Sequence, residues 1–263
     1  MRTTFAATGA TTPTYKDDTD AATRLALFLD VDGTLLDLAE RPDDVTIPAG
    51  LLSDVAAARA RTAGALALVS GRLIADLDRL FAPLRLPAAG VHGAELRLDP
   101  AGETRPAPEA DSLPLVLWTA VNGVLQAFPG PFVEDKRYSY AVHYRQAPAA
   151  GDALRARLRS LVEDLPHPGI TMLDAHCAFE LKLRQFDKGR AIAALLATPP
   201  FRDRTPIFIG DDDTDEAGFA AVSAVGGRAY SVGRRRPGVV GVFESPSDVR
   251  GWLAAFAAGS ASA

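Results

Sequence analysis

Short apolar runs of strand length alternate with stretches of helix length along most of the chain. In the first part, the runs predict strands at Leu25–Asp30, Ala65–Ser70 and Ala88–Val91, with helices between them at Pro48–Arg61 and Leu73–Phe81. The alternation resumes near the end, with a helix at Lys188–Ala197, a strand at Pro206–Ile209, a helix at Thr214–Val222, a strand at Gly227–Val232 and a helix at Pro246–Ala257. Strands that alternate with helices in this way are typical of a parallel α/β sheet.

The middle of the chain has a different order of elements. The segment Asp99–Pro108 is rich in proline, glycine and charge, which suits a linker or a hairpin. After it, the pattern predicts a helix at Pro114–Phe128, strands at Phe132–Lys136 and Ser139–Tyr144, a helix at Asp152–Asp164, and strands at Ile170–Asp174 and Ala178–Leu183. This order predicts a small antiparallel sheet backed by two helices.

The two patterns divide the chain into a core and an insertion. We expect an α/β core with a Rossmann-like parallel sheet, formed by residues 23–108 and 185–263, and an inserted α+β cap domain at residues 109–184. Residues 1–22 are rich in Thr, Ala and Asp and contain no apolar run of the kind found in signal peptides. We therefore expect a disordered leader at residues 1–22.

Composition and charge argue against several classes of protein. The net charge of −5 gives no electrostatic basis for binding nucleic acid, and no apolar run approaches the roughly 18–20 residues that cross a bilayer. The chain has a single cysteine, Cys177, which excludes an internal disulfide and fits a reducing cytoplasm. We expect the Cys177 thiol to have a structural role. No apolar seam marks a subunit interface, so we expect a cytoplasmic monomer without nucleic-acid or membrane partners.

Two aspartates end the first predicted strand. Asp30 and Asp32 are two residues apart, so they share one face of a strand, at the edge where parallel sheets bind ligands. Gly33 and Thr34 follow, and glycine permits a sharp turn whose N–H groups face an anion. Two carboxylates at the end of a buried strand need a cation beside them, and a divalent metal is the natural candidate. The alternative is a strand followed by an acidic turn.

Three further segments place polar groups where predicted strands end or helices begin. The Ser70 hydroxyl suits either a helix N-cap or a phosphate contact. Lys188 opens a helix, where the helix dipole disfavours a cation unless an anion is bound. The segment 211–216 holds five acids in six residues, which repel one another without a counter-charge. Such an oxygen-rich cluster favours a hard cation such as Mg²⁺.

Taken in order, these four segments resemble the signature motifs of the haloacid dehalogenase-like (HAD) phosphohydrolases. The resemblance implies that Asp30 attacks phosphorus to form an aspartyl-phosphate, while Asp32 acts first as general acid and then as general base. It implies a phosphate site made of Gly33, Thr34, Ser70 and Lys188. It also implies Mg²⁺ as the cofactor, bound by Asp30, the Asp32 carbonyl and Asp211, with Asp212 and Asp215 supporting the waters of the metal.

Further segments resemble the trehalose-6-phosphate phosphatase family within that superfamily. They are His92-Gly-Ala-Glu95, Val133-Glu-Asp-Lys136, His143-Tyr-Arg145 and Phe179-Glu-Leu-Lys182. The resemblance implies a small-molecule sugar-phosphate partner and hydrolysis of trehalose 6-phosphate to trehalose and phosphate. The substrate-binding residues that it implies are Arg72, His92, Glu134, Lys136, Glu180 and Lys182.

The acid–cation pairs in the predicted cap have two interpretations. Glu134 and Lys136 share one strand face, as do Glu180 and Lys182, and such pairs can hydrogen-bond the hydroxyls of a neutral sugar. The alternative is cross-strand ion pairing on a solvated face, which contributes at most about 1 kcal/mol.

Two other functions stay open at this level. One is a related phosphatase acting on another sugar phosphate, such as sucrose phosphate or mannosyl-phosphoglycerate. The other is a catalytically silent sugar-phosphate sensor. Loss of Asp30, Asp32 or Lys188 would favour the sensor, and all three residues are present.

Overall fold

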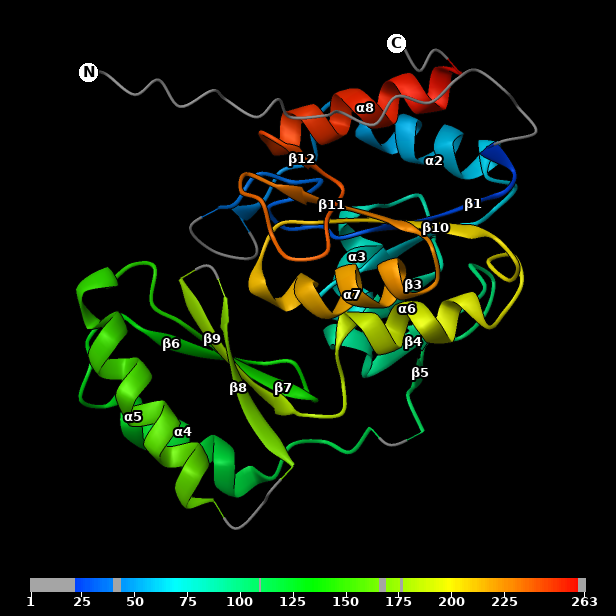
Figure 1. The fold of residues 1–263 in the computed structure, drawn as a ribbon. Helices are drawn as coiled ribbons and strands as arrows, with labels where there is room; N and C mark the ends of the chain where they lie inside the picture. The colour runs from blue at the N-terminus through cyan, green and yellow to red at the C-terminus, as the bar shows by residue number, and fades with distance from the viewer. Residues whose placement is uncertain (1–21, 40–43, 109, 166–168, 176, 260–263) are drawn as a thin grey trace, which may run out of the picture.

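An eight-stranded sheet forms the centre of the larger part of the molecule. The computed structural model describes residues 22–39, 44–108, 110–165, 169–175 and 177–259, so residues 1–21 of the predicted leader lie outside the described residues. Across the sheet (Figure 1) the strand order is β12 (Gly241–Phe243), β11 (Arg228–Val232), β10 (Thr205–Gly210), β1 (Leu25–Leu29), β2 (Leu66–Val69), β3 (Ala88–Gly90), β4 (Glu95–Arg97) and β5 (Arg105–Pro106). The strands from β12 to β3 pair in parallel, and β4 and β5 continue the sheet antiparallel.

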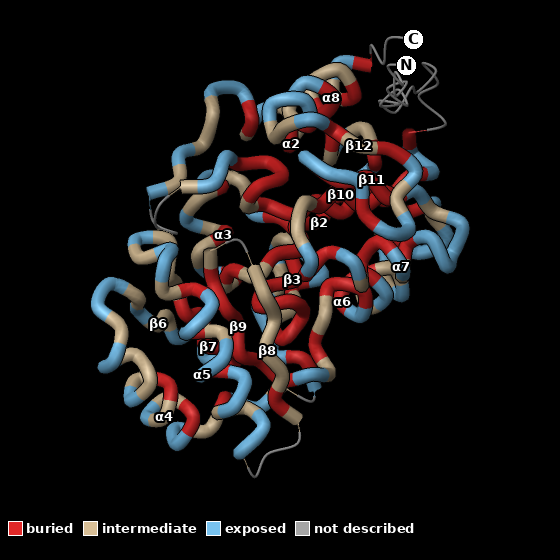
Figure 2. The backbone as a smooth tube through the Cα atoms, turned by 60° about the vertical axis from the view of Figure 1, so that its left-hand side comes forward, coloured by how far each residue is buried: buried red, intermediate tan, exposed pale blue. Residues whose placement is uncertain are grey.

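Helices cover both faces of the parallel part, which explains why its strands are apolar throughout. On one face lie α2 (Leu51–Arg61), α3 (Ile74–Leu80) and α8 (Pro246–Ala258), and on the other lie α6 (Lys188–Leu196) and α7 (Glu216–Ala224). Successive residues of β1 alternate between the two apolar clusters, and all five are buried. Figure 2 shows the buried residues concentrated along these central strands.

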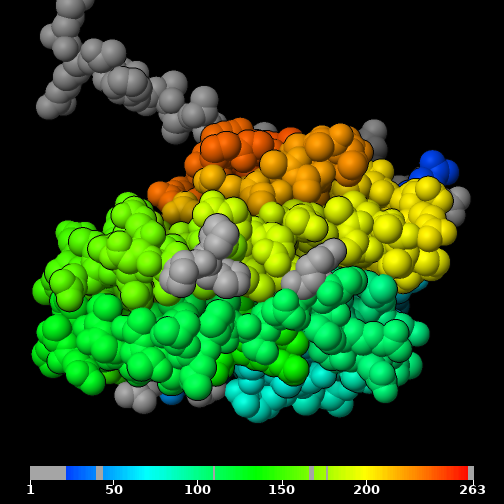
Figure 3. Space-filling view, turned by 90° about the horizontal axis from the view of Figure 1, so that it is seen from below, coloured from blue at the N-terminus to red at the C-terminus, as the bar shows by residue number. Residues whose placement is uncertain are grey.

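A second, four-stranded antiparallel sheet forms the smaller part of the molecule. Its strand order is β6 (Phe132–Asp135), β7 (Ser139–His143), β9 (Ala178–Leu183) and β8 (Ile170–Ala175). The helices α4 (Leu115–Leu125) and α5 (Gly151–Asp164) pack against one face and share a separate apolar cluster with it. Seen from below, this green segment presents a surface continuous with the cyan and yellow core segments (Figure 3).

The observed α/β architecture agrees with the predicted one, and the differences are local. The segment 99–108 belongs to a hairpin in which β4 pairs with β5. The helix predicted from Thr214 begins instead with a 3₁₀ turn at Asp213–Asp215, and α7 follows it. Strands β4, β5 and β12 were not predicted, because two or three residues are too few to show an alternating pattern; β3 is equally short and was predicted from the apolar run Ala88–Val91.

Within the described ranges, no helix combines the length and the apolar character needed to cross a membrane.

Candidate active site

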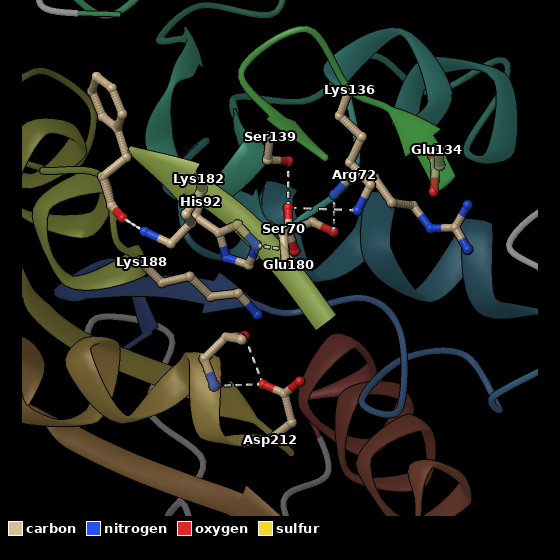
Figure 4. Close-up of polar contacts among 12 residues, drawn as sticks. Ser70, Arg72, His92, Glu134, Lys136, Ser139, Glu180, Lys182, Lys188 and Asp212 are labelled. Atoms are coloured by element: carbon tan, nitrogen blue, oxygen red, sulfur yellow. Dashed lines mark hydrogen bonds and ion pairs between the residues drawn. The ribbon is translucent and has the colours of Figure 1, made fainter. Parts of the chain in front are cut away.

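A cavity lies between the C-terminal ends of the central strands and the four-stranded sheet. Strand β1 pairs in parallel with β10 on one side and β2 on the other, so the residues that follow these three strands meet at one edge. From the core, Asp30, Asp32, Ser70, Arg72, His92, Lys188 and Asp212 line the cavity, and from the small sheet Glu134, Lys136 and Glu180 do so. The structure therefore gathers residues that are far apart in the sequence (Figure 4).

Lys188 lies between two buried carboxylates. Its Nζ donates to Asp30 Oδ1 at 2.7 Å and to Asp215 Oδ1 at 2.6 Å. Asp187 accepts a hydrogen bond from the Arg190 amide as N-cap of α6, which fixes the start of the helix that carries Lys188. Burial lowers the pKa of the Lys188 ammonium, but Asp215 and Asp30 raise it well above its usual value. The ammonium is therefore charged and partly neutralises these acids.

Three carboxyl groups, those of Asp30, Asp211 and Asp215, lie close together beside that single ammonium. Burial raises the pKa of Asp30 to about 7 and that of Asp215 to about 8, although Lys188 lowers both. Burial and the charges of Asp212 and Asp215 raise the pKa of Asp211 to about 7. Neighbouring anions disfavour ionisation unless more positive charge is present. The site is thus short of one or more positive charges.

The carboxylates of Asp30, Asp211 and Asp215 fit a divalent cation. Each offers an oxygen, and these oxygens all lie within 4.8 Å of one another. Gly33 keeps Asp211 close to the end of β1: its φ is +79°, and a Cβ there would lie 2.2 Å from Asp211 Oδ2. All-oxygen donors at this spacing suit a hard cation.

The predicted metal residues differ in how fully their oxygens are engaged. Asp215 uses one oxygen for Lys188 and accepts the backbone N–H groups of Asp211 and Asp212 with the other. Asp212 caps the following turn, with its Oδ1 accepting from the Thr214 amide and hydroxyl at 2.8 and 2.6 Å. These contacts fit supporting roles for Asp212 and Asp215 at a metal site.

Arg72 holds the side chain of Asp32. The guanidinium forms a two-point contact, with Nε donating to Oδ2 at 2.7 Å and the second bond reaching Oδ1 at 2.6 Å. Ser70 Oγ accepts the backbone N–H of Arg72 at 3.2 Å, so this hydroxyl caps the turn and also lines the cavity. Thr34 donates to Asp30 Oδ2 at 3.0 Å and thereby fixes the second oxygen of that carboxylate.

On the opposite wall, Glu180 reaches across from the small sheet to the core. Its Oε2 lies 2.8 Å from His92 Nε2, and its Oε1 accepts from Ser139 at 2.5 Å and lies 3.7 Å from Lys136 Nζ. Burial raises the pKa of Glu180, but His92 and Lys136 lower it well below its usual value. Burial lowers the pKa of His92, whereas the neighbouring Glu180 carboxylate raises it. A carboxylate can only accept, so His92 Nε2 is the donor in this contact.

Glu134 is oriented by His143 from the neighbouring strand. The two side chains meet at 2.8 Å, and the Phe132 ring stacks on the imidazole with centroids 4.8 Å apart. Burial raises the pKa of Glu134, but the hydrogen bond from His143 brings it below its usual value. Lys136 lies two residues further along and lines the same cavity. Glu134 thus offers an ionised acceptor at the cavity wall.

Lys182 lies apart from the other predicted substrate-binding residues. The residue is buried, but its ammonium donates to the carbonyls of Leu183 and Phe186 and does not line the cavity. Lys182 is the penultimate residue of β9, and the turn from this strand to α6 offers carbonyls that compete with the cavity for its donors. Its contacts therefore fix the connection between the small sheet and α6.

Two comparisons with known proteins decide the family. The profile of the trehalose-phosphatase family matches residues 28–234. A trehalose-6-phosphate phosphatase of Escherichia coli is 37% identical over 234 residues, which make up 89% of this chain and 87% of the relative. The chain belongs to the trehalose-phosphatase family. The predicted family is confirmed, and so is the prediction that the chain is a phosphoric monoester hydrolase.

Two solved structures resemble this chain in fold. The C-terminal domain of a Candida albicans trehalose-6-phosphate phosphatase has a TM-score of 0.78 at 18% identity, covering 95% of this chain and 99% of that one. A phosphatase of the HAD superfamily from Bacteroides thetaiotaomicron has a TM-score of 0.59 at 12% identity, covering 89% and 95%. At these identities the likeness concerns the fold alone, and it confirms the predicted HAD-like fold class.

The family match ends at residue 234, just before a residue near the site that the sequence analysis missed. Arg236 is buried and contacts the backbone carbonyl of Asp211. The sequence pattern that could have revealed Arg236 is the run Arg234-Arg235-Arg236, which follows the predicted strand 227–232. The acid-rich segment 211–216 follows the neighbouring strand β10 in the same way. Ser139, which donates to Glu180, was also missed, because a serine at the start of a strand carries no distinct pattern.

Proposed function

We propose that this chain is a Mg²⁺-dependent phosphatase that hydrolyses trehalose 6-phosphate to trehalose and phosphate through an aspartyl-phosphate on Asp30. The observation that carries the proposal is a cavity with two chemically different ends. One end holds Asp30, Lys188 and the acidic residues, and the other holds Glu134, Lys136 and Glu180. The choice of trehalose 6-phosphate as the substrate is inferred from relatives that are named as trehalose-phosphatases.

In the proposed first step, Asp30 attacks the phosphorus atom. A bond forms between an Asp30 carboxylate oxygen and phosphorus, the bond from phosphorus to the sugar oxygen breaks, and Asp32 gives that oxygen a proton. In the second step a water molecule attacks the phosphoryl group, Asp32 takes a proton from the water, and the Asp30 carboxylate is restored as phosphate leaves. Arg72 keeps the Asp32 side chain at the cavity wall before the substrate arrives.

Cationic groups make attack by one anion on another feasible. Lys188 contacts Asp30 directly, and Ser70 lines the same cavity, where its hydroxyl offers a donor to phosphoryl oxygens. Asp30 and Asp211, supported by Asp212 and Asp215, would hold Mg²⁺, which when bound supplies further positive charge for the phosphoryl group. The Asp32 carbonyl would complete this set, and the turn Gly33-Thr34 would offer backbone N–H groups to the phosphate.

The small sheet provides the proposed sugar-binding wall. Glu134 and Glu180 accept hydrogen bonds from hydroxyl groups, whereas Lys136 donates them. Both carboxylates are ionised and oriented by neighbouring side chains, so they are prepared to bind a neutral sugar. We assign residues 109–184 to a cap domain that carries this wall, and residues 23–108 and 185–263 to the core that carries the phosphate chemistry.

A screen of phosphate release tests the proposal. Purified protein is assayed with trehalose 6-phosphate, sucrose phosphate, mannosyl-phosphoglycerate and glucose 6-phosphate, each with Mg²⁺ or with EDTA. We expect kcat/KM to be highest for trehalose 6-phosphate and activity to disappear with EDTA. Asp30→Asn should remove activity while the circular dichroism spectrum stays that of the wild type.

Three results would contradict the proposal in different ways. A higher kcat/KM for another sugar phosphate would replace the substrate. Binding of trehalose 6-phosphate without phosphate release would favour a sensor. Phosphate release by Asp30→Asn at the wild-type rate would exclude Asp30 as the nucleophile.

A further inference from the structure

A buried arginine lies behind the acidic residues of the proposed metal site. Arg236 belongs to the loop of residues 233–240 between β11 and β12 and is 8% exposed. Its Nε donates to the backbone carbonyl of Asp211 at 2.8 Å. One terminal nitrogen also pairs with Asp213 and, at 3.4 Å, with Glu216. A buried cation requires such partners, and all three belong to the segment 211–216.

The loop that carries Arg236 is fixed independently of that segment. Pro237 restricts the backbone of Arg236 to extended conformations. Ser223 on α7 donates to the Gly238 carbonyl at 2.9 Å, and Val239 packs against the apolar cluster between the sheet and α6 and α7. The guanidinium therefore approaches Asp211 from a rigid support.

Asp211 is held through both polar groups of its backbone. Asp215 Oδ2 accepts the Asp211 N–H at 3.0 Å, and Arg236 donates to the Asp211 carbonyl. With the backbone held at both points, the Asp211 carboxylate has little freedom beyond its own side-chain rotation. Orientation of a ligand by its outer partners is a recurring feature of metal sites.

We propose that Arg236 is a positioning residue that holds Asp211 in the geometry Mg²⁺ requires, and so sets both the affinity for Mg²⁺ and the preference for Mg²⁺ over Ca²⁺. This inference rests on the proposed function only in taking Asp211 as a ligand of the metal.

A purely electrostatic role for Arg236 predicts the opposite change in metal affinity when Arg236 is replaced. A cation near a metal site repels the metal, so its removal would strengthen binding of every divalent ion. Arg236, however, is paired with two carboxylates, and its net field beyond them is small. The loss of orientation therefore outweighs the loss of repulsion.

The ratio of the Kd values for Mg²⁺ and Ca²⁺ is a readout that a general loss of stability does not change. Mg²⁺ demands near-ideal octahedral geometry at short distances, whereas Ca²⁺ accepts looser and more variable geometry. When Asp211 loses its support, binding of Mg²⁺ should weaken more than binding of Ca²⁺.

Titration calorimetry of the metal-free full-length chain tests this inference, with MgCl₂ and CaCl₂ as the injected salts. In Arg236→Gln we expect the Kd for Mg²⁺ to rise about tenfold, as is common when an outer partner of a ligand is removed, and the Kd for Ca²⁺ to rise less than threefold. Arg236→Lys keeps the charge but loses the planar fork, so its Kd for Mg²⁺ should also rise. Arg234→Gln is the matched control: Arg234 pairs with the same Asp213 but is 68% exposed, and its Kd should stay within twofold.

Several results would overturn the inference. Tighter binding of both ions in Arg236→Gln would mean that Arg236 acts by charge alone. An unchanged ratio of the two Kd values, or an unchanged Kd for Mg²⁺ with a lower Tm, would mean that Arg236 only stabilises the fold. If Arg236→Gln does not fold, Arg236→Lys decides by the same ratio. A wild-type chain that binds neither ion would contradict the proposed metal site itself, whereas phosphate release would still test the phosphatase.

Discussion

Lys188 shares its ammonium between Asp30 and Asp215, and carboxylate oxygens of Asp30, Asp211 and Asp215 all lie within 4.8 Å of one another. One ammonium therefore faces three closely spaced carboxyls, of which Asp30 and Asp215 are buried and Asp211 is half-buried. This imbalance explains why burial and mutual repulsion raise the pKa of all three. It also predicts how protons and a metal ion compete for the site.

The first prediction concerns the stability gained from Mg²⁺ at different pH. In the folded, metal-free chain the pKa values of Asp30 and Asp211 are about 7 and that of Asp215 about 8, against 3.8 for an ordinary aspartate. Between about pH 4 and pH 8 the folded state thus binds more protons than the unfolded state, and these groups make the protein less stable as pH rises. Mg²⁺ reverses this contribution because it binds the ionised carboxylates.

Thermal unfolding at pH 5.5 and pH 8, with EDTA or with excess MgCl₂, measures this effect. At pH 8 and about 100 times the Kd we expect a gain of about 2.7 kcal/mol, which corresponds to a rise in Tm of roughly 5–10 °C in a chain of this size. At pH 5.5 the rise should be much smaller. Asp211→Asn should lose most of the gain at pH 8. An equal rise at both pH values would contradict the pKa values of these groups.

At the scale of elements, the alternation of side chains along β6 places an apolar residue on one face of the strand and an acidic residue on the other. Val133 packs against the apolar cluster of the small sheet, whereas its neighbour Glu134 lines the cavity. His143 on β7 holds the Glu134 carboxylate at 2.8 Å. A hairpin of two short strands thus presents a prepared hydrogen-bond acceptor far from the attacking carboxylate in the sequence.

The second prediction uses this separation between sugar and phosphate contacts. Glu134→Gln removes a charged acceptor, and loss of one such hydrogen bond costs about 1.5–3 kcal/mol. We expect KM for trehalose 6-phosphate to rise at least tenfold, whereas KM for p-nitrophenyl phosphate stays within twofold. Glu163→Gln, an exposed position on α5, is the control. Equal changes in KM for the two substrates would mean that Glu134 does not contact the sugar.

Much of this arrangement was predictable from the sequence, because long apolar strands that end on polar residues indicate both the sheet and its active edge. Asp30, Ser70 and Asp211 follow neighbouring strands of the sheet for that reason, and Lys188 joins them from the start of α6. Contacts that depend on two loops at once were not predictable, as with the Arg72–Asp32 pair and the approach of Arg236 to Asp211. Lys182 shares a strand face with Glu180, yet carbonyls at the end of β9 bind its ammonium instead.

At the scale of the whole molecule, the cavity exists only because two sheets face each other. Among the described side chains that line it, His92 of the core and Glu180 of the small sheet join the two parts directly, at 2.8 Å and largely buried. Figure 4 shows this contact at the centre of the site, between the residues of the two walls. The pair therefore favours a closed arrangement of the molecule.

The third prediction is that His92→Ala shifts the molecule towards an open arrangement. Glu180 keeps Ser139 and Lys136 as partners, so the small sheet should stay folded while its link to the core weakens. We expect a larger radius of gyration in small-angle X-ray scattering and faster amide exchange at residues lining the cavity. His143→Ala is the control, because His143 pairs within the small sheet. Identical scattering curves for wild type and His92→Ala would show that this contact does not hold the parts together.

The close approach of Gly33 to Asp211 has a consequence for how related chains are compared. A methyl group at position 33 would lie 2.2 Å from the Asp211 carboxylate, on a backbone with φ of +79° that alanine rarely adopts. A homologue with alanine there would keep every ionisable residue of the site and still lack room for Asp211. A list of reactive side chains would count such a homologue as active, whereas the presence of one Cβ atom at position 33 would make it inactive.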